Sequence, residues 1–209
     1  MFKYKSFSIL LALVFIVSCA SRKLKKDYEV VDASHQEVPE WVNDLEEWID
    51  DEEEDAEKNR YYLYETEAKN SRSTACEIAK ARSAANVASE ISTYIKQSFA
   101  QSKHGDPTKT NEKLAEYVQD DLAKEVQAFI VGARPYKVYW EKRKFMKDKG
   151  ADKDWNGFIC ASLIKISKTQ LKSAFARTEE SLAKKVDDKA RENVQKILKE
   201  AAEAYTQES

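Results

Sequence analysis

The stretch that decides the fold is WNGFICASLIKIS, residues Trp155–Ser167. Its side chains alternate between two faces, as in a strand that is covered on both sides. One face would carry Phe158, Cys160, Ser162, Ile164 and Ile166, and the other Ile159, Ala161 and Leu163. Strand-forming residues also fill much of Phe129–Phe145, and a polar turn at Lys149–Asp152 separates the two runs. The pattern therefore predicts an antiparallel hairpin.

Upstream of the hairpin, the sequence predicts a third strand and two helices. Arg60–Ala68 is rich in tyrosine and alternates in character, which is typical of a strand. Ser71 or Ser73 can cap a long helix that runs to about Ala100. A second helix should span about residues 110–128. The expected apolar stripe of the first helix is Ile78, Ala81, Ala85, Ala88, Ile91, Ile95 and Phe99, and that of the second is Leu114, Tyr117, Val118, Leu122 and Val126.

Downstream of the hairpin, Lys168 to about Tyr205 carries apolar residues three or four positions apart. This spacing predicts one long amphipathic helix, or two helices with a break near Thr178. The half beyond about Leu182 either folds back on the domain or meets a partner helix. If it meets a partner, deletion of Leu182–Ser209 should leave a folded monomer that no longer captures that partner.

These elements predict an α+β fold: a small antiparallel sheet of about three strands, packed by two to three helices, with a long C-terminal helix. Only 4 glycines and 3 prolines occur, and 34% of residues are charged, which favours helices with solvated faces. We expect the domain to span residues 39–176, followed by a C-terminal helical extension, residues 177–209.

Two features precede the first predicted strand. Pro39–Val42 begins a short amphipathic piece whose apolar residues recur at helical spacing, so its two tryptophans either dock on the domain or bind a partner. The piece carries Trp41, Leu45, Trp48 and Ile49. Six consecutive acidic residues follow, Asp50–Asp55. Such a run usually forms a solvated loop, and it lacks the spaced ligands and the glycine of a calcium loop.

The N-terminus has the parts of a secretory signal. Lys3 and Lys5 precede an apolar run, Phe7–Val17, that is too short to span a bilayer as a stable helix. Small Ser18 and then Cys19 end the run. Residues 1–18 are therefore expected to be removed. Loss of the two lysines moves the formal net charge from −2 to −4, and this acidity argues against a nucleic-acid partner.

The run Ile16–Cys19 resembles the lipobox of bacterial lipoproteins. The resemblance implies cleavage between Ser18 and Cys19, a diacylglycerol on the Cys19 thiol, and an acyl chain such as palmitate on the new amino terminus. Several acyl chains hold a protein at a membrane effectively permanently. Ala20 at the next position implies the outer membrane of a Gram-negative host. Residues 19–38, which include a basic cluster, are expected to be a tether.

Cys76 and Cys160 remain after lipidation. An exported protein meets an oxidising compartment, so these two could form a disulfide if the fold brings them together. The other interpretation is that both are small, buried core residues.

The order of elements resembles the LPP-twenty-like family of bacterial outer-membrane lipoproteins. The motifs that carry the resemblance are Pro39–Val42, Ala79–Ala85 and Trp155–Ile166. It implies a compact α+β domain that faces the periplasm from the outer membrane, in a family with members associated with the flagellar motor or with envelope assembly. No catalytic residue is implied.

The sequence offers little for catalysis. His35 lies in the predicted tether and His104 in a predicted loop, and no phosphate loop, nucleophile elbow or metal motif appears. We therefore predict no catalytic residue, no metal and no cofactor; a hydrolase that uses carboxylates is the weakest hypothesis. The leading hypothesis is a lipid-anchored binding protein with a protein partner or a second copy at the sheet edge and the C-terminal helix. The alternative is a cell-wall module that contacts peptidoglycan through Arg134, Lys137, Lys142, Arg143 and Lys144.

Overall fold

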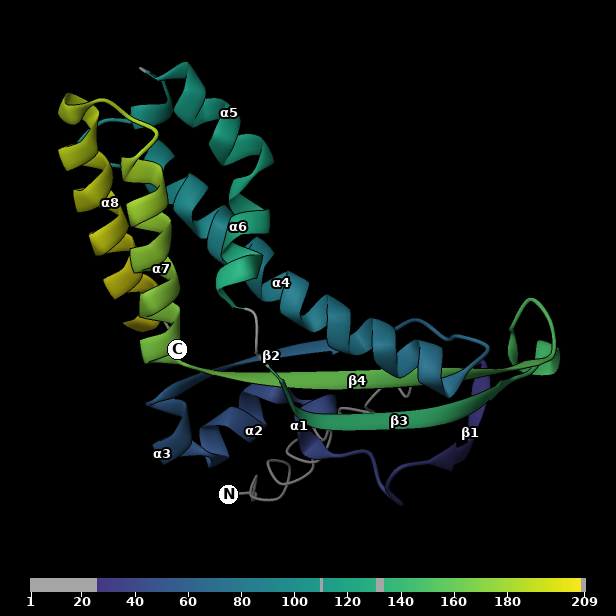
Figure 1. The fold of residues 1–209 in the computed structure, drawn as a ribbon. Helices are drawn as coiled ribbons and strands as arrows, with labels where there is room; N and C mark the ends of the chain where they lie inside the picture. Colours follow the sequence, from purple (N-terminus) through teal and green to yellow (C-terminus); the bar gives the residue numbers. More distant parts are fainter. Residues whose placement is uncertain (1–25, 110, 131–133, 208–209) are drawn as a thin grey trace, which may run out of the picture.

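The computed structural model describes residues 26–109, 111–130 and 134–207. Four strands form one antiparallel sheet in the order β1-β3-β4-β2, and helices cover both of its faces (Figure 1). The predicted α+β class is confirmed, with one strand more than expected. The strands are β1 (Tyr28–Ala33), β2 (Asn59–Glu65), β3 (Pro135–Phe145) and β4 (Trp155–Ser167).

The predicted hairpin is the centre of the sheet. β4 has the predicted bounds and pairs with β3 along its length, with Trp140 opposite Cys160 and Phe145 opposite Trp155. Its other neighbour is β2, which pairs Leu63 with Leu163. β3 begins later than expected, because Phe129 is the last residue of a helix. β4 has a neighbouring strand on each side and helices over both faces, so most of its residues are buried. This explains why apolar residues occupy both of its faces.

β1 lies in the stretch that was predicted to be a tether. It pairs with β3, placing Tyr28 opposite Phe145 and Ala33 opposite Glu141, with an irregularity between Val30 and Asp32. The four central residues of β1 are exposed, so the strand lacks the apolar alternation by which strands are recognised. Its free side is an edge of the sheet.

Helix α4 (Arg72–Ala100) crosses one face of the sheet and contacts β2, β3 and β4. Ser71 caps it as predicted, since its side chain accepts a hydrogen bond from the Thr74 amide. The second half of its buried stripe is as expected, but the first half is wrong. The helix buries Ala75, Ala79, Ser83 and Val87 in place of Ile78, Ala81 and Ala85. Small side chains at these positions let the helix axis lie close to β4.

The opposite face of the sheet is covered by α1 (Glu40–Asn43) and α2 (Leu45–Asp51). Trp41 and Trp48 are both buried there, and the Trp48 ring packs edge-on against Tyr61. The tryptophans therefore dock on the domain. The acidic run is not a loop: its start belongs to α2 and its end to α3 (Glu53–Ala56).

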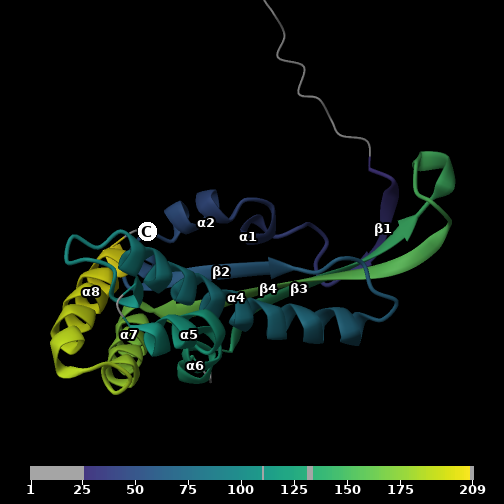
Figure 2. The same cartoon turned by 90° about the horizontal axis from the view of Figure 1, so that it is seen from above.

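The remaining helices stand at one end of the sheet, beside the C-terminal half of α4 (Figures 1 and 2). The second predicted helix is confirmed but divided at Asp121, and all five of its expected apolar residues are buried. Short 3-10 turns precede α5 and β4. The elements are η1 (Pro107–Lys109), α5 (Glu112–Asp120), α6 (Leu122–Phe129), η2 (Lys147–Lys149), α7 (Lys168–Ala183) and α8 (Asp188–Gln207).

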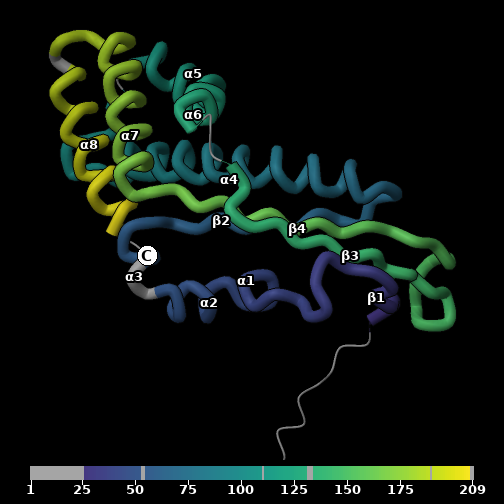
Figure 3. The backbone as a smooth tube through the Cα atoms, turned by 60° about the horizontal axis from the view of Figure 1, so that its bottom comes forward, coloured from purple at the N-terminus to yellow at the C-terminus, as the bar shows by residue number. Residues whose placement is uncertain are grey.

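The C-terminal segment folds back on the domain. Thr178 lies buried inside α7, and the break falls at residues 184–187, so its predicted position is wrong. α8 then runs back beside α7 and also contacts α4 (Figure 3). Its apolar stripe, Val194, Ile197, Leu198, Ala201 and Tyr205, belongs to the largest core cluster. In the part of the chain that the structure describes, no helix is long and apolar enough to cross a membrane.

Candidate functional site

The predicted cleavage and lipidation site, Ser18 and Cys19, lies outside the described residues. The start of the first strand shows how many residues separate Cys19 from the folded domain. β1 begins at Tyr28, nine positions after Cys19. An extended chain advances about 3.3 Å per residue, so these positions reach at most ~30 Å. A lipid on Cys19 would therefore hold the β1 edge of the sheet close to a membrane.

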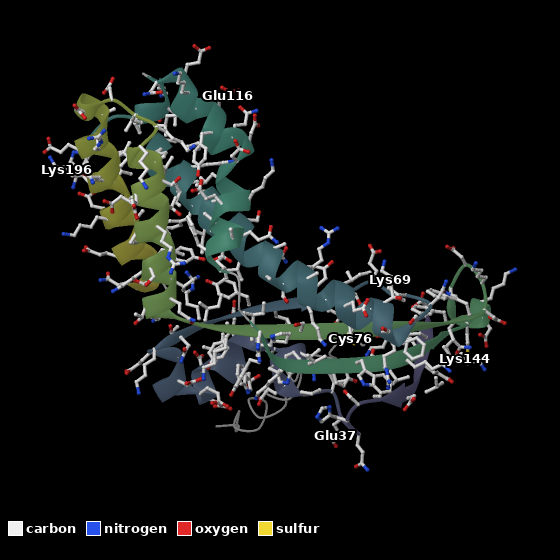
Figure 4. All side chains as sticks on the ribbon, viewed as in Figure 1. Glu37, Lys69, Cys76, Glu116, Lys144 and Lys196 are labelled. Atoms are coloured by element: carbon white, nitrogen blue, oxygen red, sulfur yellow. A yellow bond between two sulfur atoms is a disulfide. The ribbon has the colours of Figure 1, made fainter. Side chains whose placement is uncertain are left out.

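Cys76 and Cys160 are joined by a disulfide, with their Cα atoms 5.0 Å apart. Cys76 lies in the second turn of α4 (Figure 4), and Cys160 lies in the middle of β4. Buried Ala75 and Ala79 pack beside it. The bond thus ties the N-terminal end of α4 to the central strand, a structural role within the domain.

The two histidines contact different parts of the fold. The His35 ring is hydrogen-bonded to the Ser34 hydroxyl, and its centre lies 6.2 Å from the centre of the Tyr139 ring on the sheet. His104 instead reaches Glu200 of α8, at 3.4 Å. Among the described residues, no group of three or more His, Cys, Asp or Glu side chains is placed to hold a metal ion.

Asp55, at the end of the acidic run, makes hydrogen bonds and an ion pair with residues of the sheet. Its carboxylate accepts hydrogen bonds from the Tyr61 hydroxyl and the Asn59 amide and pairs with the Lys165 ammonium. The bond from Lys165, with a smaller contribution from Tyr61, lowers the pKa of Asp55. This carboxylate anchors α3 to β2 and β4, and three donors within the fold already engage it.

A second charged cluster lies on the sheet face that α1 and α2 cover. Glu141 is 3% exposed and accepts hydrogen bonds from the Tyr139 hydroxyl, at 2.9 Å, and from Arg143 Nε. Arg143 also reaches Glu65, at 3.7 Å. Burial raises the pKa of Glu65, and the Arg143 charge opposes that shift. Because the buried Glu141 charge has both a cationic partner and a hydroxyl donor, this cluster is satisfied within the fold.

The five basic residues proposed to contact peptidoglycan do not form one surface. Arg143 is paired with Glu141, on one face of β3. The ammonium of Lys142 lies over the Phe158 ring, which packs beside Ala75 and Ala79 of α4 on the other face. Lys137 lies over the Trp48 ring, near the other end of the strand. The pleat of β3 places Lys142 on the face opposite to Lys137 and Arg143, since successive side chains point to opposite faces.

The structure reveals a pocket that sequence analysis missed, with a volume of about 400 Å³. It lies where the C-terminal end of α6 and the first half of α7 meet the adjoining ends of β3 and β4. We call it the arginine pocket. Its apolar part is formed by Ile130, Ile166, Leu171 and Ala174, and its polar part includes Arg134, Arg177 and Gln170.

The charge at the arginine pocket is positive, because its described lining contains basic side chains and no acidic one. Lys165 also contributes to the wall, but its ammonium is paired with Asp55. The available charges are therefore those of Arg134 and Arg177, both on exposed side chains. No sequence motif could have found this site, because its residues come from α6, β4 and α7 and from Ile130 and Arg134, which lie between α6 and β3.

No protein-family model, no curated protein and no solved structure matches this chain. The resemblance to LPP-twenty-like lipoproteins thus stays a prediction from the sequence, and function has to be argued from the chain's own residues.

Proposed function

We propose that the protein is an envelope lipoprotein, anchored by lipid on Cys19 at the outer membrane, that acts by binding and not by catalysis. The observation that carries the proposal is the run from Lys3 to Cys19, a basic start, a short apolar stretch and a small residue before the cysteine. Strand β1 begins nine positions later, so the domain would stand directly beside its anchor.

Binding is favoured over catalysis because the carboxylates that the fold holds in charged clusters, those of Asp55 and Glu141, have structural partners. Asp55 is engaged by Lys165 and Tyr61, and Glu141 by Arg143 and Tyr139. A general acid or base must instead be free to exchange a proton with a substrate.

We further propose a protein partner or a second copy of the chain as what the domain binds. The apolar stripe of α8 is used inside the domain, so a partner would meet either the polar outer face of that helix or the free edge of β1. Lys199 lies on the first of these surfaces and is exposed. Val31 lies on the second and is 49% exposed.

Metabolic labelling with an alkyne analogue of palmitate, followed by membrane fractionation, tests the anchor. We expect the wild-type protein to be labelled and to sediment with outer membranes. Cys19→Ala should lose both properties, whereas the matched variant Ser18→Ala, which keeps a small residue before the cysteine, should retain them. A Cys19→Ala protein that is still labelled would refute the anchor.

A photo-crosslinking amino acid placed at Val31, at Lys199 or at Lys113 on α5 tests the partner. Lys113 is exposed and lies on neither surface, so it serves as the control. We expect a discrete crosslinked product from Val31 or Lys199 and none from Lys113. The same background from all three positions would refute both surfaces.

A further inference from the structure

We infer that the arginine pocket binds a small organic anion, namely a carboxylate attached to a short apolar group. This site does not depend on the lipid anchor or on the partner proposed above. Its ligand class follows from two guanidinium groups that make no ion pair with any described residue, beside a small floor of buried apolar side chains.

Most of the accessible lining of the pocket is polar, and its floor offers a small apolar surface for a group of a few carbons. Ile166, Leu171 and Ala174 are at most 4% exposed and belong to the packed interior, so the wall behind the pocket is fixed. The volume of about 400 Å³ is near the lower end of the range for small-molecule sites, roughly 300–1,000 Å³. A compact ligand therefore fits better than an extended polymer.

The charge of the pocket selects an anion. Within the described part of the chain, neither Arg134 nor Arg177 makes an ion pair with a carboxylate. The Arg177 guanidinium lies 5.9 Å from the centre of the Phe129 ring, a contact that restricts its position before a ligand arrives. Guanidinium groups bind carboxylates through two parallel hydrogen bonds, which a neutral ligand cannot reproduce.

Gln170 supplies a third polar group. Its amide oxygen accepts hydrogen bonds from the Ser167 amide and hydroxyl in the cap of α7, and these bonds fix the side chain. Its amide nitrogen has no hydrogen-bond partner among the described residues, so it can donate to a ligand oxygen. Two arginines and one amide donor thus border the small apolar floor of the pocket.

Titration of the full-length protein, purified from membranes in mild detergent, with hexanoate tests the site. Hexanamide has the same carbon chain without the charge, and it controls for partition into detergent. We expect hexanoate to shift the backbone NMR signals of residues 170–177 with a Kd of order 1 mM. Hexanamide should bind at least about tenfold more weakly, because the charged hydrogen bonds are lost.

Matched variants locate the anion. The double variant Arg134→Gln/Arg177→Gln should weaken hexanoate binding about tenfold or more, and Arg134→Lys/Arg177→Lys should fall between it and the wild type. Arg82→Gln, at an exposed position on α4, should stay within about twofold of the wild type. Circular dichroism checks that each variant is folded.

Three results would overturn the inference: no hexanoate binding up to about 20 mM, equal affinities for hexanoate and hexanamide, or an unchanged affinity in the folded Gln double variant. None of them bears on palmitate labelling at Cys19, so failure here and failure of the proposed function can be told apart.

Discussion

The guanidinium of Arg60 lies 4.2 Å from the centre of the Tyr205 ring and donates a hydrogen bond of 2.8 Å to the Tyr205 carbonyl oxygen. Arg60 is the second residue of β2, and Tyr205 lies in the last turn of α8, 145 positions later. The Tyr205 hydroxyl also contacts that of Tyr62, at 3.0 Å, and donates to Glu90 of α4, at 2.8 Å. These contacts fasten the C-terminal helix to both the sheet and α4.

Tyr205→Phe should lower the free energy of unfolding by about 1–2 kcal/mol, because it removes the bond to Glu90 and leaves the buried Tyr62 hydroxyl without a partner. Urea denaturation checks this. Tyr136→Phe is the matched control, since that side chain is 45% exposed, and it should change stability by less than about 0.5 kcal/mol. Equal effects of the two variants would contradict the role given to the Tyr205 hydroxyl.

Stability should fall as the pH rises above about 10, the ordinary pKa of tyrosine. Burial raises the pKa of Tyr62 to about 12 and raises that of Tyr205 further. Both hydroxyls therefore keep their protons in the folded state at a pH where the unfolded chain loses them. Below pH 10 both states are protonated, so the two tyrosines give no slope there. Urea midpoints across this range should decline less steeply for Tyr205→Phe than for the wild type; identical slopes would contradict this account.

Deletion of Asp188–Ser209 should abolish cooperative unfolding, contrary to the folded monomer that the sequence pattern predicted for deletion of Leu182–Ser209. The shorter deletion already removes Val194, Ile197, Leu198 and Tyr205 from the core, and each large buried side chain contributes about 2–5 kcal/mol. Thermal denaturation checks this. Lys196→Ala breaks only an exposed ion pair with Glu192, so it should cost less than about 0.5 kcal/mol. A truncated protein with a sharp transition would show that α8 is dispensable.

Loss of the Cys76–Cys160 disulfide should lower stability by about 2–4 kcal/mol, because the bond closes a loop of 84 residues in the unfolded chain. Denaturation of Cys76→Ala measures the cost. Reductant should destabilise the wild type by a similar amount and leave Cys76→Ala unchanged. Reductant that shifts both proteins equally would mean that the disulfide is not the cause.

Much of the fold could be predicted because, in some segments, the spacing of apolar residues reflects which faces of the segment are buried. Strand β4 carries apolar residues on both of its faces because both faces are buried. Ser71 marks the start of α4 with a side chain that needs only local backbone to cap it. Strand β1 could not be found in this way. Its central residues face solvent, and it is a strand only because β3 offers it a free edge.

The sequence by itself determined the fold class, the central hairpin, the capped helix α4, the apolar stripes of α5 and α6, and the prediction of a lipid anchor at Cys19. Only the tertiary structure decided that α8 folds back, that Cys76 meets Cys160, and that Arg134 and Arg177 border one pocket. The reason is physical. Periodicity and capping act between residues a few positions apart, whereas these three outcomes depend on which distant surfaces pack together.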